Sequence, residues 1–326
     1  MKTTSIALAA ITAVLLPCLV ARGQFQEPTG ERQSVSEWIE RTKDPNPEVR
    51  GQAAVALHDM GPDAKAAVPA LTRLLSDTDK GVRQEAAMAL GEMGCAANFA
   101  VPALTKLLDD EYVRGSAAEA LGHIGPEAKT AVPVLIKLLD DSRWYVRQPA
   151  AEALGKIGPE AKAAVPALAA LLQDRYDIVS DAASTALTQI GAEAKWAVPL
   201  IAKLLEENDR RVRLRAFRTL CKIGPTAREA LPALVKFVSD SNYLASLEPP
   251  EKTEKNGLSG PAMVKVIVQW MHRSDLSVRS QAECLWNVVG PADIISIKAC
   301  CGVNTGSNGT RPWTSYATLG RHPCRC

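Results

Sequence analysis

A segment of about 33 residues recurs along most of the chain, and this repetition constrains the fold more than any other feature. The stretch "GPEAKTAVPVLIKLLDD" begins at Gly125, and "GPEAKAAVPALAALLQD" begins at Gly158. An apolar-proline step recurs at nearly the same interval, at Val68-Pro69, Val101-Pro102, Val132-Pro133, Val165-Pro166, Val198-Pro199 and Leu231-Pro232. A fixed period of this length is typical of stacked-repeat proteins, in which each unit contacts mainly its neighbours.

A second anchor, an arginine that follows valine, agrees with the first. It falls at Arg50, Arg83, Arg114, Arg147, Arg213 and Arg279. Ser180 takes this position once, and the interval from Arg213 to Arg279 spans two periods. The array therefore contains one altered unit and one interruption.

Each unit is predicted to contain two helices. The first resembles "VRQEAAMALGEMG", whose apolar residues share one helical face at Val82, Ala86, Leu90 and Met93. Gly94 and its counterparts lie where we expect that helix to end in a left-handed residue. The second helix resembles "VPALTKLLDD", with Pro102 in its first turn. Its inward residues are predicted to be Leu104, Leu107 and Leu108.

A helix pair of this size cannot bury its apolar face alone, whereas stacked pairs can. The consensus "VRxxAAxALGxIGPEAKxAVPALxxLLxD" resembles the HEAT-like repeat of the phycobilisome-lyase type. The resemblance is strong from Val49 to Asp240 and weaker from Ser277 to Pro291. It implies an all-α fold, a right-handed α-solenoid of HEAT-like helix pairs.

The first 23 residues have the features of an export signal. Lys2 supplies a positive charge, an apolar stretch runs from Ser5 to Ala21, and Ala21-Arg22-Gly23 presents small residues for cleavage after Gly23. An uncleaved anchor is the alternative. We expect an exported protein, periplasmic or extracellular, that contacts the membrane only transiently through its signal peptide.

The remaining chain divides into a cap, the repeats and a tail. Residues 24–48 are predicted to form an N-terminal cap, and the solenoid to span residues 49–291. Residues 247–261 interrupt it, either as a solvent-exposed insertion or as a docking loop. The tail, residues 292–326, is irregular and carries four of the eight cysteines. Disulfide pairing or disorder is expected there, because the spacing matches no standard zinc pattern.

Composition and motifs exclude several classes of function. Lys and Arg total 38 against 36 for Asp and Glu, so the basic surface of a nucleic-acid-binding protein is not expected. No phosphate-binding loop or nucleophile motif occurs. We therefore predict no catalytic residues, no metal site and no cofactor.

The repeated arginine has two interpretations. Stacking would align Arg83, Arg114 and Arg147 into a ladder that either binds an anion or pairs with aspartates within the solenoid. Asp79, Asp109, Asp110 and Asp141 are the nearby candidates. Pairing is the favoured interpretation, because each unit carries its own aspartate.

Four aromatic residues precede the Val-Arg anchor, or its counterpart Val179-Ser180, in three successive units: Tyr112, Trp144, Tyr145 and Tyr176. Equivalent turns of a solenoid project along one edge, so these residues are candidates for a partner-binding surface. The alternative is that each ring covers the junction of its own repeats.

The function predicted from the sequence is that of an exported HEAT-repeat scaffold for protein–protein interaction, with a protein partner of unidentified nature. The resemblance to phycobilisome lyases leaves open a bilin lyase-like protein that attaches a chromophore. A structural envelope component is a third possibility.

Overall fold

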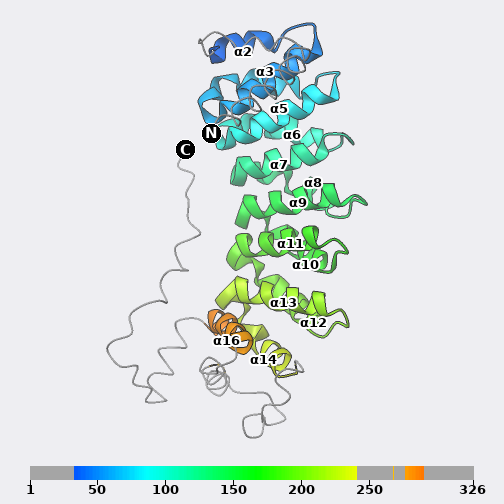
Figure 1. The fold of residues 1–326 in the computed structure, drawn as a ribbon, viewed down its shortest axis with the longest axis vertical. Coiled ribbons are helices and arrows are strands. Elements are labelled where there is room, and N and C mark those ends of the chain that lie inside the picture. Colours follow the sequence, from blue (N-terminus) through cyan, green and yellow to red (C-terminus); the bar gives the residue numbers. More distant parts are fainter. Residues whose placement is uncertain (1–32, 241–266, 268–275, 290–326) are drawn as a thin grey trace, which may run out of the picture.

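The computed structural model describes residues 33–240, Ile267 and residues 276–289. Every regular element in these ranges is a helix. The helices stack in one elongated column, with α2 (Val35–Arg41) at one end and α16 (Leu276–Val289) at the other (Figure 1). This architecture confirms the α-solenoid that the repetition predicts.

Each unit has a first helix, a 3-10 segment and a second helix. The first helices are α3 (Pro47–Asp59), α5 (Lys80–Glu92), α7 (Arg114–Ile124), α9 (Trp144–Ile157), α11 (Asp177–Ile190) and α13 (Arg210–Ile223). The second helices are α4 (Val68–Leu74), α6 (Val101–Leu107), α8 (Val132–Leu138), α10 (Val165–Ala170), α12 (Val198–Leu204) and α14 (Leu231–Asp240). The 3-10 segments between them are η1 (Gly61–Ala67), η2 (Gly94–Ala100), η3 (Gly125–Ala131), η4 (Gly158–Ala164), η6 (Gly191–Ala197) and η7 (Gly224–Ala230). A further 3-10 turn, η5 (Leu171–Gln173), follows α10.

The glycine that opens each of the six 3-10 segments between paired helices has a positive φ, as the sequence predicts, but from Gly125 onward its ψ is not that of a left-handed helix. Gly125 has φ 82° and ψ −141°, and Gly158 has φ 75° and ψ −139°. These values differ from the left-handed helical conformation expected from the sequence, and only glycine adopts them readily because other residues have a Cβ. The sharp turn into η3 and η4 therefore depends on glycine.

The core runs the length of the column and is built largely from alanine, leucine and valine. Leu104, Leu107 and Leu108 are all buried, as are Val82 and Leu90 on the first helix of the same unit. The inward faces predicted from the helical spacing are thus confirmed.

Glycine and alanine set the distance between successive first helices. A Cβ added to Gly122 would lie 2.8 Å from the Cα of Ala153, and one added to Gly155 would lie 2.7 Å from the Cα of Ala186. Such distances are shorter than a real Cβ contact allows. The helices α7, α9 and α11 are therefore packed closely enough to exclude any side chain at these two positions.

Helix α2 packs against the start of the array. Ser34 and Glu37 form a reciprocal capping box at its N-terminus, and Trp38 and Ile39 are half-buried against the core. The predicted signal peptide (1–23), insertion (247–261) and tail (292–326) lie outside the described residues. Within the described ranges, none of the helices has the length and apolar character needed to span a bilayer.

Candidate interaction surface

The repeated arginines form a regular set of ion pairs. In four units, the arginine binds an aspartate 27 residues further along the chain. The pairs and their N–O distances are Arg50–Asp77 at 2.7 Å, Arg83–Asp110 at 2.6 Å, Arg114–Asp141 at 2.9 Å and Arg147–Asp174 at 2.7 Å. Each bridge links the first turn of a first helix to the turn after the second helix of the same unit.

The same arginines also bind the turn that precedes their helix. Arg147 donates from Nη1 to the carbonyl oxygens of Asp141 and Ser142, at 2.7 and 3.0 Å. Its partner Asp174 accepts the backbone N–H of Tyr176 at 2.9 Å. One guanidinium and one carboxylate therefore fix two successive turns, and with them the residues that those turns carry.

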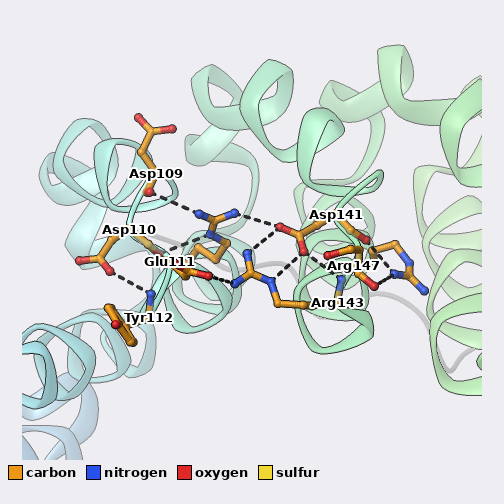
Figure 2. Close-up of polar contacts among 9 residues, drawn as sticks. Asp109, Asp110, Glu111, Tyr112, Asp141, Arg143 and Arg147 are labelled. Carbon is orange, nitrogen blue, oxygen red and sulfur yellow. Dashed lines mark hydrogen bonds and ion pairs between the residues drawn. The ribbon is translucent and has the colours of Figure 1, made fainter.

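The bridges join into a network between α7 and α9, shown in Figure 2. Asp141 accepts hydrogen bonds from Arg114 and Arg143, and Arg143 also reaches Glu111 at 2.8 Å. The hydrogen bonds from Arg143 hold the pKa of the Asp141 carboxyl far below its usual range, against the opposing effect of burial. Asp141 is therefore ionised across the physiological pH range, and the two turns are held together by charge.

The ladder is a structural device, as the favoured interpretation held, although two of the predicted partners differ. Asp79 instead caps α5 by accepting the N–H of Val82, and Asp109 contributes its backbone carbonyl to Arg114. The aspartate that binds each guanidinium lies in the turn after the second helix. Its carboxylate is held in place because it also accepts the backbone N–H of the residue two positions further on.

The ladder is interrupted at Ser180 on α11. The Ser180 hydroxyl donates to the carbonyl oxygen of Asp177 at 2.9 Å and makes no bridge to the next turn. Arg215 of α13 approaches this region from the following unit instead. It donates to the carbonyl of Leu172 at 3.0 Å and to the carboxylate of Asp177 at 2.7 Å. An arginine at a different position thus links α13 to the altered unit.

Three of the four predicted aromatic residues come together on the surface. The ring of Trp144 lies 6.1 Å from that of Tyr145, edge to face, and 6.1 Å from that of Tyr176. Trp144 and Tyr145 occupy the first turn of α9, whereas the sequence placed them in the preceding turn. Tyr176 is the N-cap residue of α11. Two neighbouring units therefore contribute to one aromatic cluster, the Trp144–Tyr145–Tyr176 cluster.

Positive charges flank the cluster. The guanidinium of Arg175 lies 4.8 Å from the centre of the Tyr176 ring, and that of Arg143 lies 5.9 Å from the Tyr145 ring. Tyr145 remains 52% exposed, and Trp144 and Tyr176 are each more than one-third exposed. Rings that are half-covered by cations and half open to solvent present both apolar area and hydrogen-bonding groups to a partner.

Tyr112, the fourth predicted residue, lies apart from the ring cluster. The Lys80 ammonium lies 4.5 Å from the centre of the Tyr112 ring, and the tyrosine side chain is 69% exposed. The Glu111–Arg143 ion pair connects its turn to the start of α9 (Figure 2). Tyr112 therefore belongs to the same edge of the solenoid without touching the cluster.

Two exposed aromatic residues were not identified from the sequence. Phe99 in η2 is 86% exposed, and Trp196 in η6 is 67% exposed. Both stand two residues before the Val-Pro step, where the other units have Ala66, Thr130, Ala163 and Glu229. This mixture of small and polar residues indicates that the position faces solvent. Comparing the units at this position would therefore have identified Phe99 and Trp196 as exposed.

In the part of the chain that the structure describes, no three histidine, cysteine or acidic side chains are grouped as metal ligands would be. His123 is exposed on α7, and His58 pairs weakly with Asp59 and Glu92 at 3.4 and 3.9 Å. These histidines occupy surface positions along the first helices.

Comparison with known proteins agrees with the architecture. A family model for HEAT repeats matches residues 35–122 and 101–188. A solved structure of an engineered protein is 27% identical, with a TM-score of 0.53, over 84% of this chain and 85% of its own. The complex of CpcE and CpcF of phycocyanin lyase from Nostoc sp. PCC7120 is 26% identical, with a TM-score of 0.45, over 84% of this chain and 98% of its own. No curated protein matches the sequence.

The matched repeats coincide with the helix pairs from α2 to α11, and the same pattern of helix, 3-10 segment and helix continues through α13 and α14. Residues 35–188 of the chain are thus matched by the HEAT-repeat family.

Proposed function

We propose that this protein is an exported scaffold that binds another protein through the edge of the solenoid bearing Tyr112 and the Trp144–Tyr145–Tyr176 cluster. The observation that carries the proposal is the meeting of three exposed aromatic rings from two adjacent units. Tryptophan and tyrosine are enriched among the residues that dominate binding energy at protein interfaces.

The support beneath these rings favours a binding role. The Arg147–Asp174 bridge and the network around Asp141 fix the turns from which the rings project. A surface that is already rigid loses little conformational entropy when a partner docks. The solenoid itself offers a long, continuous face of stacked units, which suits an extended protein partner.

Affinity capture with the mature chain tests this proposal. We expect the wild type to capture a partner that the variant with both Trp144 and Tyr145 changed to alanine no longer captures. The dissociation constant of that variant for the partner should be at least about tenfold higher. Circular dichroism should show unchanged helical content. The matched control changes Phe99 and Trp196 to alanine, which removes two exposed aromatic residues from the 3-10 segments and should leave capture intact.

Two outcomes would contradict the proposal. If the variant at Trp144 and Tyr145 keeps its fold and its affinity, these rings serve only to pack at the junction between repeats. A new visible absorbance band after incubation with a linear tetrapyrrole would support the lyase alternative instead of a scaffold.

Export is a separate part of the proposal and has its own measurement. The order of Lys2, the apolar stretch and Ala21-Arg22-Gly23 supports cleavage after Gly23. The intact mass of the exported protein should correspond to a chain beginning near Gln24. A mass that retains residues 1–23 would show an uncleaved anchor.

A further inference from the structure

Two cysteines far apart in the sequence meet at the C-terminal end of the described solenoid. Cys221 lies near the end of α13, and Cys284 lies on α16, which packs against α13. Their thiols are hydrogen-bond partners. Both are free thiols in this structure.

The repeats provide an internal comparison for these two positions. The residues equivalent to Cys221 in the other units are His58, Gly91, Gly122, Gly155, Thr188 and Asn287. Those equivalent to Cys284 are Val55, Met88, Glu119, Glu152, Thr185 and Arg218. Neither position requires cysteine for packing, because other residues fill it in every other unit. Cysteine stands at both positions only at this one junction, where the two residues face each other.

The two thiols differ in their surroundings. Cys221 is almost fully buried, whereas Cys284 is partly exposed to solvent. The hydrogen bond from Cys221 lowers the pKa of Cys284 to about 7, and Arg218 adds to this effect against the opposing effects of burial and Glu283. The same contact, with burial, raises the pKa of Cys221. At neutral pH, about half of Cys284 is therefore thiolate, and it is the thiol of the pair that solvent can reach.

We propose that Cys221 and Cys284 form a redox site, in which a small-molecule disulfide such as glutathione disulfide converts the two thiols into one intrachain disulfide. The site adds a covalent link between α13 and α16, and it is independent of the binding function proposed above. The disulfide then closes a covalent loop of the chain from Cys221 to Cys284, which includes residues 241–275.

The chemistry proceeds by two exchange steps. The Cys284 thiolate attacks one sulfur of the glutathione disulfide, a Cys284–glutathione bond forms, and the first glutathione thiolate leaves. Cys221 then loses its proton and attacks the Cys284 sulfur, which releases the second glutathione thiolate. Two electrons pass from the cysteine pair to the reagent, and the two glutathione thiolates take up two protons from solvent, which balance those that Cys284 and Cys221 release. Reduction by a dithiol reverses both steps.

Peptide mapping of the full chain tests the proposal directly. The protein is incubated with glutathione disulfide at neutral pH, its remaining thiols are alkylated, and it is digested with trypsin without reduction. We expect one cross-linked product that joins residues 219–222 to residues 280–298, lighter by about 2 Da than the sum of the two peptides. Prior treatment with dithiothreitol should remove it. Amides of α16 should exchange with solvent about tenfold more slowly in the oxidised protein.

Three variants complete the experiment. Cys221→Ser and Cys284→Ser should each abolish the cross-linked peptide and the slower exchange, whereas Cys95→Ser, the matched control, should keep both. A fourth chain with serine at Cys300, Cys301, Cys324 and Cys326 should also keep both, because the tail is not required. Failure of the wild type to yield the 219–222 and 280–298 product, or pairing of Cys284 with a different cysteine, would overturn the proposal.

Discussion

The α7–α9–α11 stack and the α11–α13 junction are built from the same repeat, but they pack differently. In the stack, Gly122 and Gly155 meet Ala153 and Ala186 so closely that no Cβ fits. At the α11–α13 junction, Thr188 stands in the glycine position and Thr219 in the alanine position. The two helices accordingly pack against each other less extensively than α7 and α9 or α9 and α11.

Polar contacts replace close packing at this junction. The hydroxyl groups of Ser184 and Thr219 are buried and lie 2.8 Å apart, where the stack has only alanine methyl groups. Ser180 makes no bridge to the next turn, and Arg215 supplies the link instead. A few side chains at fixed repeat positions thus decide whether a junction is dry and close or polar and looser, while the helix pair itself is unchanged.

The largest effect is expected when a charge enters the closely packed stack. Leu121 on α7 is fully buried, so Leu121→Asp places a carboxylate among apolar side chains with no partner. We expect the free energy of unfolding to fall by about 4 kcal/mol, as measured by chemical denaturation. His123→Asp, two residues further on at an exposed position, should change it by less than about 0.5 kcal/mol. Equal losses for the two variants would show that the facing of α7 is wrong.

Adding bulk at the glycine position compares the two junctions directly. Gly155→Leu forces α9 away from the backbone of α11 at Ala186, and we expect a loss of about 3 kcal/mol in unfolding free energy. Thr188→Leu makes a similar change at the α11–α13 junction, where a side chain is already accommodated, and should cost less than about 1 kcal/mol. If thermal melting shows the same loss in both, the two junctions do not differ in packing.

Copying the altered unit into the stack tests the arginine ladder. Arg147→Ser reproduces Ser180 and leaves Asp174, whose side chain is 6% exposed, without its guanidinium. We expect a loss of about 2 kcal/mol in unfolding free energy, because a buried carboxylate loses its charge partner. Arg211→Ser removes a solvent-exposed partner of Asp209 and should leave the denaturation midpoint unchanged. A silent Arg147→Ser variant would mean that the ladder adds no stability.

The comparison also shows what the sequence could predict. The period, the two helices of each unit and the buried faces follow from spacing alone, because apolar residues at helical spacing share one face and stacking buries that face against the neighbouring units. The partner of each arginine was harder to predict: Asp79, Asp109, Asp110 and Asp141 were all candidates, and only the geometry of the turn selects Asp110 for Arg83. Likewise, the sequence placed the aromatic residues on one edge, but side-chain orientation decides that Trp144 meets Tyr176 and that Tyr112 stays apart.

The smallest effect is expected at the polar pair that distinguishes the α11–α13 junction. Thr219→Ala leaves the buried Ser184 hydroxyl without its partner, and we expect a loss of about 1 kcal/mol. Ser184→Ala should cost less, since Thr219 still donates to the carbonyl of Arg215 at 2.8 Å. The double variant restores the alanines that the stack carries, Ala118 and Ala151 at one position and Ala153 and Ala186 at the other. It should therefore be more stable than the sum of the two single changes predicts.

The double-mutant cycle should give a coupling of about 1 kcal/mol in urea denaturation. Ala87→Ser, which introduces a hydroxyl at the position equivalent to Ser184 without its threonine partner, serves as the matched control and should destabilise the chain. Strictly additive single variants would show that the two hydroxyls contribute independently. The looser packing of α11 and α13 would then rest on Thr188 and the missing Arg–Asp bridge alone.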